Sequence, residues 1–374
     1  MIRTALALAA VVLIAHELSG VRPPSPPKAP YPPSPVIKSL SIEPERQSIG
    51  DGENWPITCA DDDHLYTVYR DGKGFGGGSG EGGMSLAKIA GSPPNVTGQN
   101  IVSATGHKTS GGPEGRKASG LLMVDGVLYM WVRNLKKDGT GSSLAWSKDH
   151  ARTWTWADWS FPEIGYPVWM NAERNYEAAQ DDFAYVYSPD TASAYKTSDH
   201  LVLARVPKDQ ITKKDGYQFF AGLDEGGKPR WTANLKNRKP VFTDPGHCYR
   251  PEVIYNPGIK RYLLCTASSG SPKWCGTDEK YVGIFNAPTP WGPWTVVKQI
   301  EGWGGEENRF QPRIPAKWVS TDGRGFYLLY SCFSTVLCCQ SSVRRSAWLV
   351  ANRLEEEPTR ATGRRSPHPF PPGP

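Results

Sequence analysis

The sequence predicts an all-β fold, a five-bladed β-propeller built from four-stranded antiparallel blades. Three observations support this prediction: a composition suited to short strands, one stretch that contains a complete blade, and a strand pattern that recurs along the chain. The 374 residues include 39 glycines and 34 prolines, and 11% of them are aromatic. Such a composition favours many short strands and turns over long helices.

The stretch from residue 118 to 156 contains the strands of one blade. GLLMV is a continuous apolar run, as expected for a strand that is buried on both faces. Asp125-Gly126 is a dipeptide that favours a tight reversal of the chain. VLYMWV, SLAWS and TWTW follow as three β-branched or aromatic segments. Four short strands joined by turns are the usual content of a propeller blade.

A tyrosine in an apolar strand after a turn recurs about every 65 residues, at Tyr66, Tyr129, Tyr185, Tyr262 and Tyr327. A period of this length indicates a repeat architecture. A closed ring of five such units buries faces that a single sheet would leave exposed. The alternative is a two-sheet sandwich, which has turns every 8–12 residues or so but no longer period.

We expect the propeller to occupy residues 36–350, with the alternating segment 36–42 completing the last blade. Residues 1–20 contain Arg3 followed by an apolar run, which predicts a signal peptide or a short uncleaved anchor. Residues 21–35 contain eight prolines and form an extended linker. Residues 351–374 are expected to be a disordered tail. These segments predict a protein that is secreted, periplasmic or tethered to the cell surface.

Charge and cysteine content exclude several classes of function. The formal net charge is +6, but most of it lies in the two ends of the chain, so the middle offers no basic face for nucleic acid. The seven cysteines include no C-x-x-C pair that would indicate zinc. The sequence predicts no metal ligands and no cofactor, although a cation in the central channel is left open. No membrane span beyond the N-terminal anchor is expected, and we expect a monomer.

The segment from Ser147 to Trp154 reads SKDHARTW. It resembles the Asp box of sialidase-like propellers, S-x-D-x-G-x-T-W, with Ala151 in the place of glycine. The resemblance implies that Asp149 caps a hairpin and has a structural role.

Several longer segments carry a more specific resemblance: DGENWPITCADD, GLLMVDGVLYMWVRN, SLAWSKDH, DDFAYVYSPD, LARVPKD, CYRP and PWGPWT. Together they resemble a bacterial domain-of-unknown-function family, number 4185, over roughly residues 48–333. The resemblance implies a five-bladed propeller with an architecture similar to glycoside hydrolase family 43. Some relatives in that family are hydrolases that cut arabinan.

Cleavage of a glycosidic bond requires one carboxylic acid to protonate the leaving oxygen and a second carboxylate as nucleophile or base. Asp51 and Asp71 are the first candidates, because both are expected at the mouth of the central channel. Glu252, at the start of the inner strand of the fourth blade, is the third. The alternatives are a strand cap for Asp51, a hairpin turn for Asp71 and an Arg250–Glu252 ion pair between blades for Glu252.

Candidate substrate-binding residues are expected at the same mouth: Asn54, Trp55, Lys117, His247 and Arg250. Trp55 is the tryptophan expected to stack on a sugar, whereas Trp146, Trp154 and Trp156 are expected as wedges between blades. His247 could equally be a hydrogen-bonded structural group.

Two functions follow from these residues. The first is an exported glycoside hydrolase-like protein that acts on a polysaccharide through paired carboxylates. The alternative is a non-catalytic propeller that binds a glycan.

Overall fold

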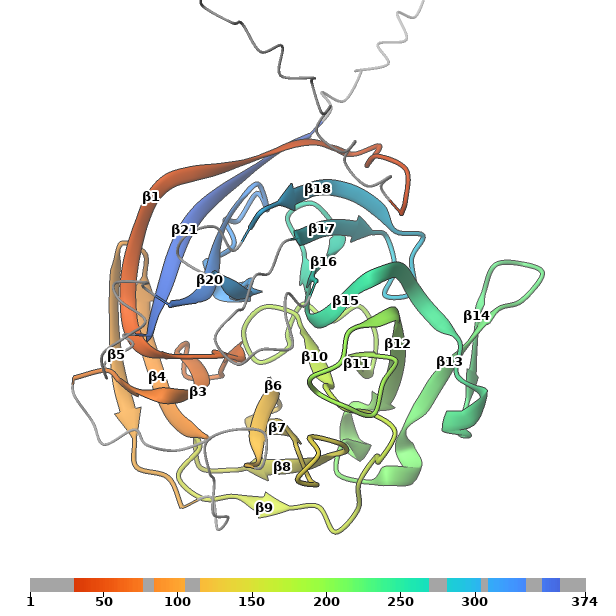
Figure 1. Cartoon of the computed structure of the whole chain (residues 1–374), viewed down its shortest axis with the longest axis horizontal. Coiled ribbons are helices and arrows are strands. Elements are labelled where there is room, and N and C mark those ends of the chain that lie inside the picture. The colour runs from red at the N-terminus through yellow and green to blue at the C-terminus, as the bar shows by residue number, and fades with distance from the viewer. Residues whose placement is uncertain are drawn as a thin grey trace, which may run out of the picture.

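The computed structural model describes residues 30–76, 84–104, 115–268, 281–303, 309–333 and 345–356. Over these ranges the chain is all-β, and its strands form a five-bladed propeller seen along its axis in Figure 1. The helical segments in the described part are short 3₁₀ turns at Lys208–Gln210, Lys214–Gly216, Leu235–Asn237 and Ala316–Trp318. In that part of the chain no helix is long and apolar enough to cross a membrane.

The first two blades lie on one side of the ring. Blade one contains β2 (Ile57–Cys59), β3 (Leu65–Gly74), β4 (Ser85–Ser92) and β5 (Asn95–Ile101). Blade two contains β6 (Lys117–Val124), β7 (Val127–Arg133), β8 (Ser142–Ser147) and β9 (Thr155–Trp156). The predicted Asp125-Gly126 turn joins β6 to β7, and both of its residues have the positive φ that this tight reversal needs.

The next two blades share one sheet. Blade three contains β10 (Val168–Asn171), β11 (Phe183–Pro189), β12 (Ser198–Pro207), β13 (Gln218–Leu223) and an additional β14 (Pro229–Thr232). Blade four contains β15 (Pro240–Asn256), β16 (Arg261–Ala267), β17 (Tyr281–Ala287) and β18 (Thr295–Glu301). The inner strands β10 and β15 are parallel neighbours.

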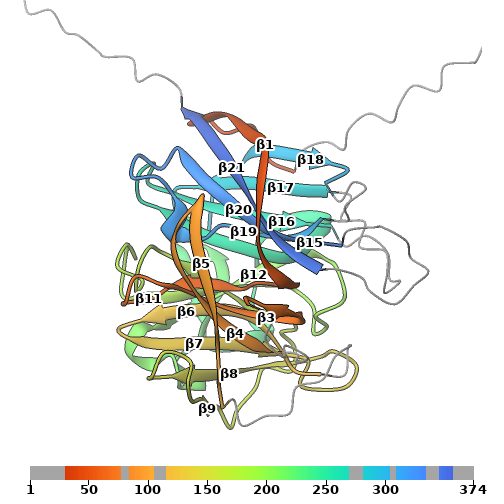
Figure 2. The ribbon, with the colours of Figure 1, turned by 90° about the vertical axis from the view of Figure 1, so that its left-hand side faces the viewer.

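Blade five contains β19 (Phe310–Arg313), β20 (Gly325–Phe333), β21 (Arg345–Glu356) and, as its outermost strand, β1 (Ile37–Glu53). Figure 2 shows β1 running beside β21, and their pairing extends from Ile37 to Asp51 of β1. The prediction that the N-terminal strand completes the last blade is therefore confirmed. One boundary needs correction, because β21 continues to Glu356 and residues 351–356 belong to the sheet.

The tyrosines that predicted the repeat all lie in the second strand of a blade, in β3, β7, β11, β16 and β20. The inner strands contact one another in the order β2, β6, β10, β15 and β19, so they line the axis. Side chains from blades that are not neighbours can meet only there.

Aromatic residues fill the space between blades two and three. Trp131 of β7 is 1% exposed, and its ring centroid lies 5.4 Å from that of Trp169 in β10. Trp131 and Trp169 therefore separate the two blades, while the expected wedges Trp146, Trp154 and Trp156 are only half-buried at the edges of the core.

The turn from Ser147 to Thr153 is held by side-chain hydrogen bonds. The carboxylate of Asp149 accepts from the Thr153 amide at 2.9 Å and from the Thr153 hydroxyl at 2.6 Å. Ser147 Oγ donates to Asp149 and accepts from the amide of Ala151. Burial alone would raise the pKa of Asp149, but the bonds from Thr153 and Ser147 lower it to about 2.

Candidate functional site

Asn54 lies at the axis, where β1 ends and before β2 begins. Its φ is 76°, a conformation that asparagine tolerates better than most residues. Its backbone N–H donates to Ser331 Oγ of blade five, and its Nδ2 donates to the carbonyl of Ala118 in blade two. Asn54 therefore fixes three blades relative to one another.

A buried chain of hydrogen bonds crosses the axis from Asn54. The hydroxyl of Tyr166, just before β10, donates to Asn54 Oδ1 at 2.7 Å and accepts from Arg313 Nη2 at 3.0 Å. Arg313, the last residue of β19, also donates from Nη1 to Glu252 Oε2 of β15 at 2.9 Å. We call these four residues the axial network; each is at most 4% exposed.

Glu252 is the buried carboxyl group of this network. One of its oxygens pairs with Arg313, and the other, Oε1, has no hydrogen-bond partner in the described part of the chain. Burial raises the pKa of Glu252 to about 7 although the charge of Arg313 opposes the shift. The alternative prediction of an Arg250–Glu252 ion pair is wrong, because the arginine that binds Glu252 is Arg313 on the neighbouring blade.

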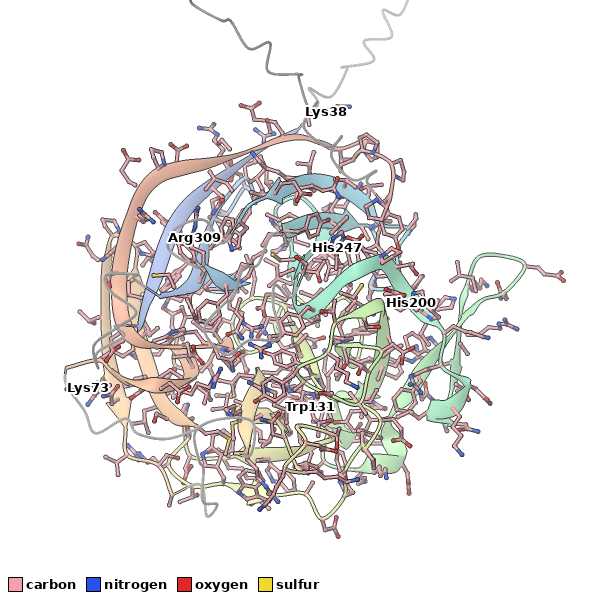
Figure 3. The ribbon with its side chains drawn as sticks, viewed as in Figure 1. Lys38, Lys73, Trp131, His200, His247 and Arg309 are labelled. Carbon is pink, nitrogen blue, oxygen red and sulfur yellow. The ribbon has the colours of Figure 1, made fainter. Side chains whose placement is uncertain are left out.

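A second group of carboxylates lies where β1 meets β3. Arg70 of β3 forms ion pairs with both Glu53 and Asp71. Asp51 pairs through its backbone with Gly74, and its carboxylate accepts from the amide of Lys73 at 2.9 Å. Asp51 and Asp71 thus lie in the same paired segment of two strands. Figure 3 shows Lys73 at the outer edge of the ring, so this segment extends away from the axis.

Three cations approach the axis from blades two and four. We call Lys117 of β6, Arg133 of β7 and Arg250 of β15 the cationic cluster. The Arg133 guanidinium carbon lies 5.2 Å from the ring centroid of Tyr166 and 5.3 Å from that of Tyr195. The corresponding distances from Arg250 are 5.4 and 5.9 Å. Lys117 Nζ lies 3.4 Å from the hydroxyl of Tyr195.

These charges shift the pKa values of their neighbours. Burial alone would raise the pKa of Tyr195, but the nearby charges of Arg133, Lys117 and Arg250 outweigh it and lower that pKa to about 7. Burial and the charge of Arg133 lower the pKa of Lys117 to about 8. The phenol of Tyr195 and the carboxyl group of Glu252 therefore both titrate near neutral pH at the axis.

The structure brings several of the sequence-predicted residues together. Asn54 and Glu252 belong to the axial network, Lys117 and Arg250 to the cationic cluster, and Asp71 is joined to them through Arg70, whose charge acts on Lys117 and Arg133. Asp51 lies beside this group in the β1–β3 segment.

Two predicted residues lie elsewhere. Trp55 is 1% exposed, stacks on Tyr69 at 5.2 Å and donates from Nε1 to the carbonyl of Gly52. The prediction that Trp55 lies in the cleft is wrong, because a ring covered on both faces cannot stack on a sugar. His247 stacks on Tyr281 at 4.2 Å and binds Asp244, which raises the pKa of His247.

Sequence reasoning missed Arg133, Tyr166, Tyr195 and Arg313. Arg133 and Arg313 each end an inner or second strand, the position that singled out Lys117 at the start of its strand. A charged residue at the end of an apolar strand was therefore a usable signal. Tyr166 and Tyr195 lie in loops, where no periodic pattern marks them.

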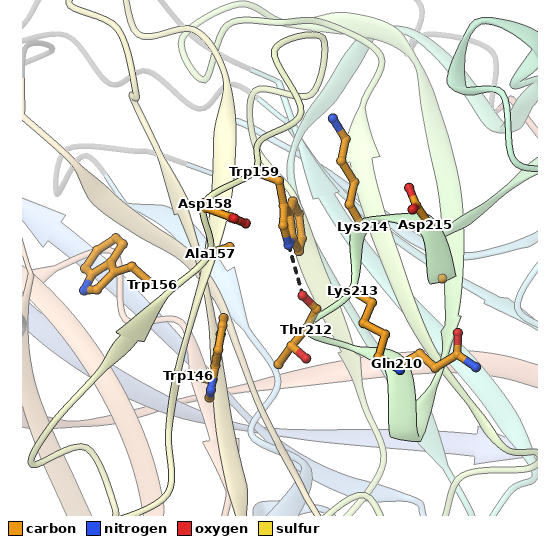
Figure 4. Close-up of a pocket in the computed structure, with 11 residues that line it drawn as sticks. Trp146, Trp156, Ala157, Asp158, Trp159, Gln210, Thr212, Lys213, Lys214 and Asp215 are labelled. Atoms are coloured by element: carbon orange, nitrogen blue, oxygen red, sulfur yellow. Dashed lines mark hydrogen bonds between the residues drawn. The ribbon is translucent and has the colours of Figure 1, made fainter.

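A separate cavity of about 720 Å³ lies on the outer side of blades two and three. Figure 4 shows its lining, with Trp146 and Trp156 on one side, Lys213 and its neighbours on the other, and Trp159 between them. Trp159 donates to the carbonyl of Thr212 at 3.0 Å. We call this space the rim cavity.

One surface group has ligands that a cation could share. Within the described ranges, ligand atoms of Asp61, Asp62 and His150 lie within 4.8 Å of one another. His150 Nε2 is already 2.8 Å from Asp61, and Asp62 accepts from the Tyr66 hydroxyl at 2.9 Å. These contacts explain the group as a hydrogen-bonded pair of hairpins, so it supplies no argument for a metal.

The fold and the site define a β-propeller with a buried polar axis. No protein-family model and no curated protein sequence matches the chain. Among solved structures it is similar to a GH43_1 enzyme from Xanthomonas citri, with 15% identity, a TM-score of 0.47 and coverage of 81% of this chain and 88% of that one. It is also similar to a thermostable family-43 glycoside hydrolase, with 14% identity, a TM-score of 0.46 and coverage of 91% and 99%.

A third similar structure is an exo-β-1,3-galactanase from Phanerochaete chrysosporium, with 12% identity, a TM-score of 0.47 and coverage of 83% of this chain and 64% of that one. Likeness at this level of identity concerns the arrangement of strands. The function has to be inferred from the side chains of this chain.

Proposed function

We propose that the protein is a glycoside hydrolase-like protein that acts on a polysaccharide at the axis of the propeller. The observation that carries this proposal is Glu252, a buried carboxyl group with one oxygen held by Arg313 and the other without a partner among the described residues. Buried polar groups normally have partners, and a catalytic role is one explanation of an exception. A carboxyl group with a pKa of about 7 can keep its proton at neutral pH and donate it to a leaving oxygen.

The second carboxylate would come from the β1–β3 segment. Asp71 is connected to the axis through Arg70, and Asp51 lies on the paired strand. Either could activate water or attack the sugar once a glycan displaces the contact it now makes. Lys117 and Arg250 would bind sugar hydroxyls. Both side-chain atoms of Asn54, the other predicted binding residue at the axis, are already bonded, Nδ2 to Ala118 and Oδ1 to Tyr166. The N-terminal apolar run and the proline-rich linker support a location outside the cytoplasm.

A second candidate is a propeller that binds a glycan without cleaving it. One observation favours it: each carboxylate nearest the axis is held by an arginine, Glu53 and Asp71 by Arg70, and Glu252 by Arg313. A carboxylate bound in this way is a weaker nucleophile than a free one.

The test is a hydrolysis and binding screen against arabinan, xylan, galactan and polygalacturonate. Wild type is compared with Asp51→Asn, Asp71→Asn and Glu252→Gln, and exposed Asp209→Asn serves as the matched control. We expect wild type and Asp209→Asn to hydrolyse one of these glycans, and Glu252→Gln to lose at least 100-fold in rate while keeping its glycan affinity.

Two results would change the conclusion. If wild type binds a glycan but cleaves none, the second candidate is correct. If wild type neither binds nor cleaves any of these glycans, both candidates are contradicted.

A further inference from the structure

We propose that the cationic cluster binds an acidic group of the glycan, the carboxylate of a uronic acid or a sulfate ester. This inference rests on the proposed site and names the class of substrate that the site takes. It starts from the position of Lys117, Arg133 and Arg250, which reach the same two tyrosine rings from two different blades.

Arg133 lacks the partners that a buried guanidinium needs. It is 0% exposed, and the guanidinium donates from Nη1 to Asn134 Oδ1 at 3.1 Å. Nε and Nη2 are buried without an acceptor among the residues that the structure describes. Burying a charge without pairing it is costly, so an arginine held in this state by the fold indicates a ligand that supplies the acceptor.

Two members of the cluster have no carboxylate partner among the described residues. Lys117 and Arg133 form no ion pair in that part of the chain, and the cations that lower the pKa of Lys117 are Arg133 and Arg70. The charges of Arg250 and Arg70 also act on Arg133. Among the described residues, Glu53 and Asp71 pair with Arg70 and Glu252 pairs with Arg313, so none of these carboxylates pairs with Lys117 or Arg133 beside Tyr195.

When it is ionised, the phenol of Tyr195 supplies a negative charge beside the cationic cluster. Its hydroxyl lies 3.4 Å from Lys117 Nζ and accepts from Asn134 Nδ2 at 2.8 Å. The surrounding charges lower its pKa to about 7, so that it supplies a negative charge when no ligand does. A bound oxyanion would take over this role and return Tyr195 to its neutral form.

The neighbouring groups suit an anion attached to a sugar. The planar guanidinium groups of Arg133 and Arg250 offer paired donors that match two oxygens of one carboxylate or sulfate. Once it is neutral, the hydroxyl of half-buried Tyr195 offers a hydrogen bond for a ring hydroxyl. The propeller itself carries little net charge, which disfavours a long polyphosphate chain as the ligand.

The experiment measures binding of polygalacturonate, dextran sulfate, neutral dextran and inorganic sulfate by calorimetry. We expect one of the two acidic glycans to bind at least 10-fold more tightly than dextran, and the choice between them identifies the acidic group. Lys117→Gln should weaken that affinity at least 10-fold, a larger loss than it causes in the affinity for dextran. Arg250→Gln is the second variant, used if circular dichroism shows that Lys117→Gln does not fold.

Lys213→Gln is the matched control. Lys213 is an exposed cation that lines the rim cavity, so this variant should bind like wild type if the acidic group lies at the axis. Loss of acidic-glycan binding in Lys213→Gln, equal affinity for acidic and neutral glycans, or binding of no probe would overturn the proposal. Hydrolysis of a neutral glycan with no preference for acidic glycans would support the hydrolase proposal and contradict this inference. Selective binding of an acidic glycan without hydrolysis would support this inference and contradict the hydrolase proposal.

Discussion

The hydroxyl of Tyr166 lies 2.7 Å from Oδ1 of Asn54, a residue 112 positions earlier in the chain. The two side chains belong to blades three and one, which are not neighbours in the ring. Their contact therefore holds the axis together where no backbone ladder can, and Arg313 of blade five joins it from the other side.

Replacing Tyr166 with phenylalanine should destabilise the protein by about 2–4 kcal/mol, because Asn54 Oδ1 and Arg313 Nη2 each lose a buried partner. The free energy of unfolding measured in urea checks this expectation. Tyr255→Phe is the control, since Tyr255 is also buried and its hydroxyl makes no hydrogen bond with the described residues. Equal losses in the two variants would show that the hydroxyl of Tyr166 contributes nothing specific.

Tyr195 should produce a phenolate signal near neutral pH. Ultraviolet difference spectra of wild type against Tyr195→Phe are expected to show a step near pH 7, where ordinary tyrosines are still protonated. Above this pH the phenolate adds a negative charge beside Lys117, which itself loses its proton near pH 8. The phenolate repels an anion and the neutral amine no longer attracts one, so affinity for an acidic glycan should fall as pH rises from 6 to 9.

The groups that face Tyr195 set the sign of this dependence. Arg133, Lys117 and Arg250 act on it directly, and Glu252 lies on the same inner strand as Arg250. An anion that binds here should raise the pKa of Tyr195, because it cancels the charges that lower it. A phenolate step that stays at pH 7 when an acidic glycan is bound would contradict the assignment.

Asp149→Ala should destabilise blade two by about 1–3 kcal/mol, because the amide and hydroxyl of Thr153 lose a charged acceptor. The pKa of Asp149 is lowered, so its contribution is present above pH 4 and is lost as pH falls toward 2. Thermal melts at pH 7 and pH 3 check both statements. Asp158→Ala, at an exposed carboxylate nearby, should leave the melting temperature unchanged at either pH.

The repeated strands could be predicted because the residues that form each blade are consecutive in the sequence and show a local pattern of strands and turns. Tyr129 and Asp125-Gly126 mark one hairpin, and the corresponding tyrosines mark the others. The closure by β1 was also predictable, since a ring of this kind otherwise leaves an unpaired edge.

The chemistry at the axis could be predicted only in part. Lys117 and Glu252 were found because each lies at the start of an inner strand, and Asn54 because it precedes one. The partner of Glu252 was missed because Arg313 lies 61 positions away, on another blade. Trp55 was misplaced because sequence does not show that Tyr69 and Phe75 cover its ring. Contacts between blades depend on how the ring closes, and this cannot be predicted from a local sequence pattern.

Glu252→Gln should change the pH dependence of stability in a defined direction. The pKa of Glu252 is raised in the folded protein to about 7, whereas the unfolded chain titrates near 4.5. Between these values the unfolded state loses its proton first, so wild type becomes less stable as pH rises, by at most about 3 kcal/mol. Glutamine has no proton to lose, and the variant lacks this slope.

The stability difference between Glu252→Gln and wild type should therefore shift in favour of the variant from pH 4 to pH 7 and stay constant above pH 8. The other titrating groups are common to both proteins, so the slope of the difference isolates the carboxyl group of Glu252. Urea denaturation at four pH values measures the slope. A flat difference would show that Glu252 is ionised throughout this range, and it could not then act as the general acid of the proposed reaction.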